Sequence, residues 1–114
     1  MEVNLHSEPG YNSLLGSGTE ITGYGFRGFG NKDDDWRIEC KGKESGAALT
    51  GDTQFRLRHV NSRKYLNNSQ RIFTERNCPR CSIHGHFEIS GTSTQSDSSL
   101  WRVHSGFTIE AEDY

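Results

Sequence analysis

Residues 55–66 read FRLRHVNSRKYL, and this stretch decides the fold. Phe55 and Leu57 alternate with Arg56 and Arg58, so an extended strand would place the two pairs on opposite faces. The polar letters NSRK then supply a turn, and YL begins a return strand. The stretch therefore predicts a β-hairpin with one apolar face and one charged face.

The arginines and lysine of this hairpin raise the question of nucleic-acid binding. A nucleic-acid surface should extend beyond one hairpin and give a positive balance, but the formal net charge of the chain is -2. We therefore expect no nucleic-acid partner. No apolar run is long enough to cross a bilayer, so we also expect no membrane span in this chain.

The rest of the chain consists of short apolar runs separated by turn residues, with no sustained helical period. Thirteen glycines against two prolines indicate tight turns rather than a proline-rich linker. Hydrophobic residues make up only 31%, but six Phe, four Tyr and two Trp can build a core from few large side chains. This pattern predicts an all-β barrel or sandwich.

Short sequence matches indicate a duplication. EITG at 20–23 matches EISG 68 residues later, WRI at 36–38 matches WRV 65 residues later, and NL at 4–5 matches YL 61 residues later. An equal order with drifting spacing is typical of a repeat with variable loops. One unit cannot bury its own apolar face, so the copies must pack together. The predicted organisation is a single domain, 1–114, with repeat units 1–48 and 49–114.

The opening hairpin, the E-I-x-G segment and the Trp follow one another in the order of a MIR repeat. The chain resembles the MIR family over nearly its whole length. This resemblance implies a β-trefoil, a short barrel closed by hairpins. A trefoil has a third unit, which would here be missing, divergent or supplied by another chain. Met1 leads directly into an expected strand, EVNL, so we interpret the chain as part of something longer.

Within the MIR family, the small stand-alone members similar to stromal cell-derived factor 2 fit best, and the MIR region of protein O-mannosyltransferases fits next. The resemblance implies a non-enzymatic protein of the endoplasmic reticulum lumen or secretory pathway, without a cofactor. It would associate with a J-domain co-chaperone and its Hsp70, or with a client polypeptide. A carbohydrate-binding trefoil and an accessory domain of an O-mannosyltransferase stay open as alternatives.

Exposed aromatic residues on glycine-rich loops would carry the binding of a protein or a glycan. For His6 and His59 we favour structural hydrogen bonds over ligand contact, and we find no nucleophile motif near them, so we expect no catalytic residues. Trp36 and Trp101 are expected to fill the core. The candidate ligand-binding residues are His6, Tyr11, Tyr24, Phe26, Phe29 and His59.

A cysteine and histidine cluster offers a weaker, metal-binding interpretation. Zinc accepts four such donors in tetrahedral sites. We favour instead a disulfide from Cys40 to one cysteine of the cluster, or free thiols. A strand through Ile83 and Phe87 would bury its odd positions and leave the histidines in solvent. The members of this cluster are Cys78, Cys81, His84 and His86.

The acidic run at residues 33–35 could suggest calcium together with Asn31. It lacks the glycine and distal glutamate spacing of an EF-hand loop. We therefore predict a solvated turn before Trp36.

Overall fold

The computed structural model describes residues 3–25, 29–42 and 52–103. Within these ranges the elements are short β-strands and two single turns of 3₁₀ helix, so the predicted all-β class is confirmed. The strands are β1 (Asn4–His6), β2 (Thr19–Glu20), β3 (Thr22–Tyr24), β4 (Trp36–Cys40), β5 (Phe55–His59), β6 (Tyr65–Ile72) and β7 (Phe87–Thr92). The 3₁₀ turns are η1 (Lys32–Asp34) and η2 (Asp97–Ser99).

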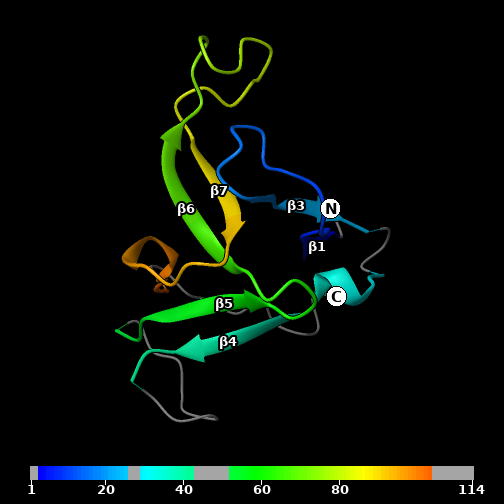
Figure 1. The fold of residues 1–114 in the computed structure, drawn as a ribbon, viewed down its shortest axis with the longest axis vertical. Helices are drawn as coiled ribbons and strands as arrows, with labels where there is room; N and C mark the ends of the chain where they lie inside the picture. Colours follow the sequence, from blue (N-terminus) through cyan, green and yellow to red (C-terminus); the bar gives the residue numbers. More distant parts are fainter. Residues whose placement is uncertain (1–2, 26–28, 43–51, 104–114) are drawn as a thin grey trace, which may run out of the picture.

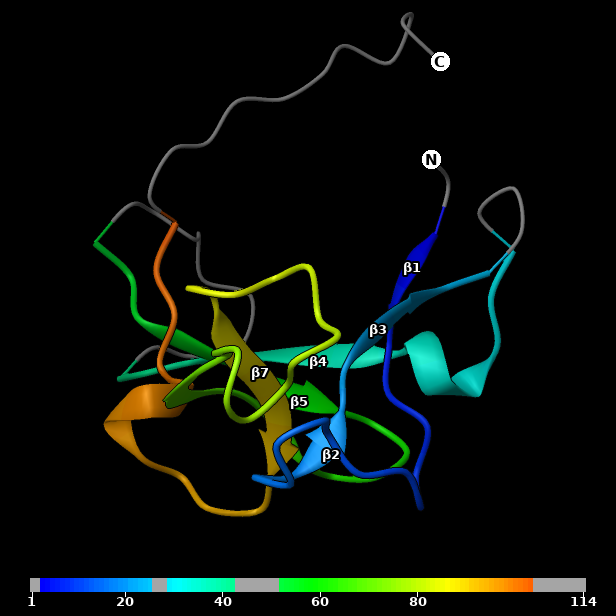
Figure 2. The same ribbon diagram turned by 90° about the horizontal axis from the view of Figure 1, so that it is seen from above.

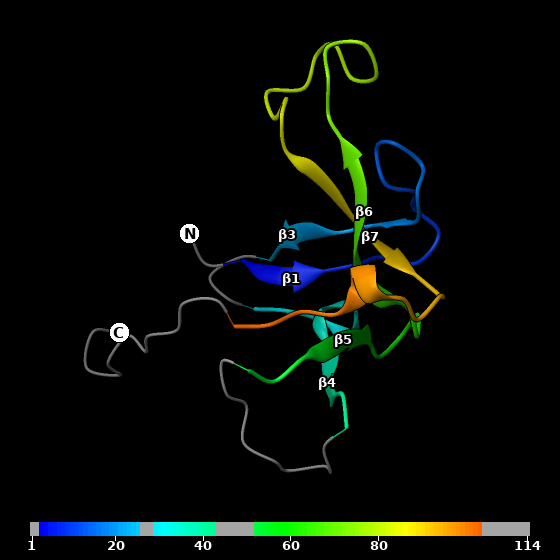
Figure 3. The same ribbon diagram turned by 90° about the vertical axis from the view of Figure 1, so that its left-hand side faces the viewer.

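Five strands form one antiparallel sheet in the order β2-β7-β6-β5-β4, and β1 pairs with β3 in a separate two-stranded sheet. Figures 1 and 3 show the β6–β7 hairpin at the top, the β1–β3 pair across the middle and the β4–β5 pair below. The pairing of β2 with β7 joins the two halves of the chain in one sheet, and Figure 2 shows this junction from above. A Cβ atom on Gly91 would overlap the hydroxyl of Thr19, so β2 and β7 approach closely there and a larger residue would displace the Thr19 side chain.

Residues 55–66 form the predicted hairpin. β5 meets β6 with Arg58 opposite Tyr65, and along its other edge β5 pairs with the whole of β4. The N–H of Arg63 donates to the carbonyl of His59 at 2.7 Å and closes the turn. β6 then runs on with a bulge between Asn68 and Ile72.

Each tryptophan makes the same contact in its own half of the chain. The indole N–H of Trp36 donates to the carbonyl of Leu5 at 3.0 Å, and that of Trp101 donates to the carbonyl of Leu66 at 2.8 Å. Both tryptophans are half-buried, so the expectation that they fill the core is wrong in part. Each indole N–H bonds a carbonyl of a distant strand, while part of each ring stays exposed to solvent.

A serine contact is repeated in the same way. The hydroxyl of Ser7 donates to the carbonyl of Glu20, and the hydroxyl of Ser69 donates to the carbonyl of Glu88, both at 2.9 Å. Ser69 lies three residues after Leu66, whereas Ser7 lies two residues after Leu5, and the irregular register of β6 between Asn68 and Ile72 accommodates the extra residue. The exact unit limits, 1–48 and 49–114, stay a prediction.

The interior is rich in polar groups. Among the described residues, the buried large apolar side chains are those of Tyr65, Leu66 and Phe73. No buried side-chain nitrogen or oxygen of the described residues lacks a hydrogen-bond partner, so burial of these groups is compensated. Specific polar contacts therefore hold much of this fold. The largest fully buried side chains are His59, Glu88, Ser7, Ser90 and Ser99.

Candidate binding site beside the acidic turn

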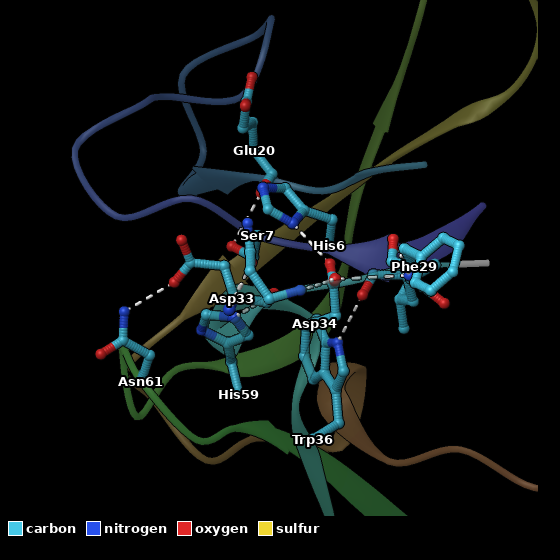
Figure 4. Close-up of polar contacts among 12 residues, drawn as sticks. His6, Ser7, Glu20, Phe29, Asp33, Asp34, Trp36, His59 and Asn61 are labelled. Atoms are coloured by element: carbon cyan, nitrogen blue, oxygen red, sulfur yellow. Dashed lines mark hydrogen bonds and ion pairs between the residues drawn. The ribbon is translucent and has the colours of Figure 1, made fainter. Parts of the chain in front are cut away.

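The acidic turn, residues 31–35, lies against two buried histidines (Figure 4). Asp33 is buried and the side chain of Asp34 is only 8% exposed, so the prediction of a solvated turn is wrong for both. The side chain of Asn31 accepts the N–H of Asp33 at 2.8 Å, and Asp34 accepts the N–H of Asn31 at 2.7 Å. This reciprocal capping box fixes the turn. Asp35 is exposed.

His6 and Asp34 form a buried, hydrogen-bonded pair at the centre of the turn. Nδ1 of His6 lies 2.7 Å from Oδ1 of Asp34. Burial raises the pKa of Asp34, but hydrogen bonds from His6 and the Asn31 N–H, the charge of His6 and the Asn4 amide outweigh it and hold this pKa below 3.8. The ionised carboxylate therefore accepts a charge-assisted bond from the ring.

His59 fastens the hairpin of residues 55–66 to the same turn. Its Nε2 lies 2.7 Å from the carbonyl of Asp33, and its Nδ1 accepts the N–H of Ser62 at 3.2 Å. A carbonyl only accepts, so Nε2 of His59 is the donor in the contact with Asp33. The amide of Asn61 donates to Asp33 Oδ1 at 2.7 Å. Both histidine rings are thus buried and bonded within the fold, which is the structural role that the sequence favoured.

An aromatic hollow of about 420 Å³ lies beside the acidic turn. Tyr24 is 55% exposed and Phe29 is 76% exposed, although both are large and apolar. The ring of Tyr24 stacks on that of His6 with centroids 4.5 Å apart, and the amide of Asn4 donates to the carbonyl of Phe29 at 3.2 Å. The described residues that line the aromatic hollow are Gly23, Tyr24, Gly25, Phe29, Gly30 and Asn31.

Glycines give this hollow its shape. A Cβ atom on Gly30 would overlap the carboxylate of Asp34, and one on Gly25 would lie 2.6 Å from the carbonyl of Phe29. Gly25 also has a φ of 126°, which other residues rarely adopt. The backbone therefore approaches itself closely at the base of the aromatic hollow, and side chains larger than hydrogen do not fit at these two positions.

The other candidate ligand residues have separate positions. Tyr11 is 55% exposed but does not line the aromatic hollow. Phe26 lies outside the described residues. The structure therefore places Tyr24 and Phe29 around one hollow, with His6 against the ring of Tyr24, whereas His59 contacts Asp33 of the acidic turn.

The cysteine cluster is paired differently from the expectation. Cys78 and Cys81 form a disulfide with each other, and Cys40 is a free thiol, so the favoured bridge from Cys40 is wrong. His84 Nε2 lies 2.7 Å from the carbonyl of Cys78. Among the described residues no group of three or more His, Cys, Asp and Glu side chains is gathered for a metal ion.

The expected alternation along the strand at 83–87 is also wrong. Ile83 is 39% exposed and Phe87 is 49% exposed. Turn residues precede β7, which begins only at Phe87, so no extended strand forces odd positions inward.

Sequence reasoning missed Glu88 as a structural centre. Its side chain is buried, and it accepts the N–H of Leu15 at 2.7 Å and the hydroxyl of Ser17. Burial raises the pKa of Glu88, but bonds from Ser17, Ser13, the Leu15 N–H and Ser69 outweigh it and hold this pKa below 4.5. The available signal was the repeated E-I-x-G segment, which places a glutamate at the junction of β2 and β7.

The fold, with tryptophan and serine contacts that occur in both halves, is that of a β-trefoil-type repeat protein. The chain is similar to the stromal cell-derived factor 2-like protein of Dictyostelium discoideum, with 27% identity over 94% of this chain and 46% of that protein. The resemblance drawn from the sequence is therefore confirmed. No family model matches the chain.

Two solved structures share the fold. The crystal structure of the SDF2-like protein from Arabidopsis thaliana superposes with a TM-score of 0.74 at 21% identity, over 89% of this chain and 51% of that one. A Caenorhabditis elegans protein of unknown function superposes with a TM-score of 0.75 at 28% identity, over 94% of this chain and 55% of that one. The chain thus spans about half the length of the relatives that it matches. The described residues include no helix of the length and apolarity that a membrane crossing requires.

Proposed function

We propose that this chain is a non-catalytic binding module of the endoplasmic reticulum lumen, where it associates with a J-domain co-chaperone and its Hsp70. The similarity to a stromal cell-derived factor 2-like protein supports the setting. The buried polar groups support a scaffold role, because His6, Asp34 and His59 are committed to hydrogen bonds within the fold. These hydrogen bonds support a role in binding rather than in catalysis.

The exposed pair Tyr24 and Phe29 is the observation that carries the proposal. Two large rings in solvent around one hollow are typical of a contact surface, and aromatic anchors often contribute about 2 kcal/mol or more each to binding. The ring of Tyr24 lies against that of His6, and the amide of Asn4 bonds the carbonyl of Phe29, so both residues are restrained from within the fold. Restraint of this kind lowers the conformational entropy that is lost on binding.

Pull-down from an extract of the endoplasmic reticulum tests the proposal. The wild-type chain should recover a J-domain protein and an Hsp70, and Tyr24→Ala or Phe29→Ala should lose most of that recovery. Tyr11→Ala is the matched control, because Tyr11 is as exposed as Tyr24 but lies outside the aromatic hollow. Failure of the wild type to recover either protein, or equal loss in the control, would sink the proposal.

A glycan is the second candidate ligand of the same hollow. Sugar rings stack on exposed aromatic faces, and Asn31 adds a polar group at the edge. The measurement is a glycan array followed by NMR titration of a positive sugar. Binding that is lost in Tyr24→Ala would favour the glycan, whereas a blank array without sugar-induced shifts would exclude this candidate.

The accessory-domain alternative makes a different prediction. A chain that belongs to an O-mannosyltransferase would continue into many membrane-spanning segments. The full-length reading frame decides between this alternative and a small lumenal protein.

A further inference from the structure

A second hollow, lined by arginine, lies away from the aromatic residues. This arginine hollow has a volume of about 320 Å³ and is bounded by β4, β5 and the turn that follows β5. Its size is at the lower end of the range for small-molecule sites. The lining residues are Arg37, Arg58, His59, Val60 and Arg63.

The strand register places two of these arginines against each other. Arg37 and Arg58 are direct partners in the β4–β5 ladder, so their side chains share one face of the sheet. Like charges at directly opposite positions destabilise a sheet. Glu39 approaches Arg58 only to 3.8 Å, which is too long for a hydrogen bond, so it compensates this charge weakly.

The guanidinium groups of the arginine hollow are largely unused. Within the described residues, Arg37 and Arg63 make no side-chain hydrogen bond or ion pair, and Arg58 directs only its Nε to a carbonyl, at 3.3 Å. Arg56 is a contrast on the same strand face, since it donates to Ser99 at 2.9 Å and to the carbonyl of Ser96 at 3.0 Å. Arg56 is thus hydrogen-bonded within the fold, whereas the three arginines that line the arginine hollow keep N–H donors without a partner among the described residues.

Two further features hold the arginine hollow in shape. The guanidinium of Arg58 lies 5.4 Å from the ring centroid of Tyr65, a cation–π distance that fixes its direction. Arg63 has a φ of 63°, a left-handed conformation that an arginine adopts at a cost. The turn that carries Arg63 is tied to the acidic turn through His59 and Asn61.

We propose that the arginine hollow binds a single phosphate or sulfate group. Three guanidinium groups offer planar, bidentate donors to such a tetrahedral anion, and its charge would relieve the repulsion between Arg37 and Arg58. Val60, which is 54% exposed, supplies an apolar contact for a carbon skeleton attached to that group. The net charge of -2 and the small volume match a compact anion and not a nucleic-acid strand.

Titration calorimetry at low ionic strength tests the proposal with inorganic phosphate, sulfate and glucose 6-phosphate, and with glucose as the neutral probe. We expect saturable one-site binding of the anions and none of glucose. Tighter binding of glucose 6-phosphate than of inorganic phosphate would identify an ester as the source of the group, and equal binding would identify the free anion. Absence of saturable binding by every anion would overturn the proposal.

Variants separate this site from general charge attraction. Arg37→Gln and Arg63→Gln should each weaken anion binding about tenfold. Arg80→Gln is the matched control, because it removes the same charge from an exposed position outside the hollow, and it should change binding less than about twofold. Equal weakening by all three variants would reject a specific site. Without ligand, Arg37→Gln should keep or raise the melting temperature, because it removes a like-charge pair, and a loss would assign Arg37 a structural role instead.

Discussion

Replacement of Glu88 by Gln tests whether polar contacts hold the two halves of the chain together. The side chain of Glu88 is 2% exposed and accepts bonds from Leu15 and Ser17, which are more than 70 residues away in the chain. Glutamine keeps the shape but exchanges one acceptor oxygen for a donor NH₂ group. The amide oxygen can still accept the N–H of Leu15 and the new NH₂ group can donate to the hydroxyl of Ser17, but both bonds lose the charge of the carboxylate.

The expected loss follows from these contacts. A hydrogen bond to a charged group contributes about 1.5–3 kcal/mol and a neutral one about 0.5–1.5 kcal/mol, so the weakening of both bonds should cost about 2 kcal/mol. A domain of this size has a free energy of unfolding of about 5–15 kcal/mol, so the change is a large share of the total. Ser17→Ala should also lower stability, because it removes the hydroxyl that donates to the buried carboxylate.

The assay is urea unfolding followed by tryptophan fluorescence, with the midpoint and slope both fitted. Glu20→Gln is the matched control, since Glu20 occupies the corresponding E-I-x-G position but its carboxylate has no bonding partner among the described residues. This control should stay within about 0.5 kcal/mol of the wild type. A Glu88→Gln loss under about 1 kcal/mol, or an equal loss in the control, would refute the reasoning.

Three other perturbations have defined outcomes. Gly30→Ala should displace the carboxylate of Asp34 and lower stability by about 2–3 kcal/mol, whereas Gly23→Ala, where only a Val3 methyl lies within 3.0 Å, should cost less in the same urea assay. The pKa values of Asp34 and Glu88 are lowered by folding, so their contribution is complete above pH 3.8 and 4.5 and is lost as the pH falls through the folded values. The free energy of unfolding should therefore be lower at about pH 3 than at about pH 6, and this difference should be smaller in Asp34→Asn. A flat pH profile would contradict this reasoning. Trp101→Phe should cost about 1–2 kcal/mol, because the carbonyl of Leu66 loses its donor, and an unchanged melting curve would argue against that bond.

Local sequence pattern was sufficient to predict the strands and the hairpin. The alternation in residues 55–66 has period two, which is a property of the strand itself, and the hairpin forms as predicted. The prediction of a β-trefoil came from the resemblance to MIR repeats, because that resemblance rests on the order of several motifs rather than on one segment. Tyr24 and Phe29 were found because exposed aromatic residues beside glycines form a local signal.

Contacts between residues that are far apart in the chain could not be predicted from local sequence pattern. Three consecutive aspartates look solvated, yet Asp33 and Asp34 meet Asn61 and His6, each 28 residues away. Glu88 depends in the same way on Leu15. For Cys78 and Cys81 the deciding fact is the turn between them, which brings their Cα atoms to 5.5 Å, a spacing that the sequence alone does not reveal.

The bonds from Trp36 to Leu5 and from Trp101 to Leu66 end on main-chain carbonyls. Every amino acid carries that acceptor, so substitution of either leucine would leave the acceptor of the bond unchanged. The donor, by contrast, requires an indole or a comparable ring N–H in that position. The two ends of the bond are therefore under different constraints, and in longer chains the spacing of tryptophans should locate further copies of the unit more reliably than the leucines do.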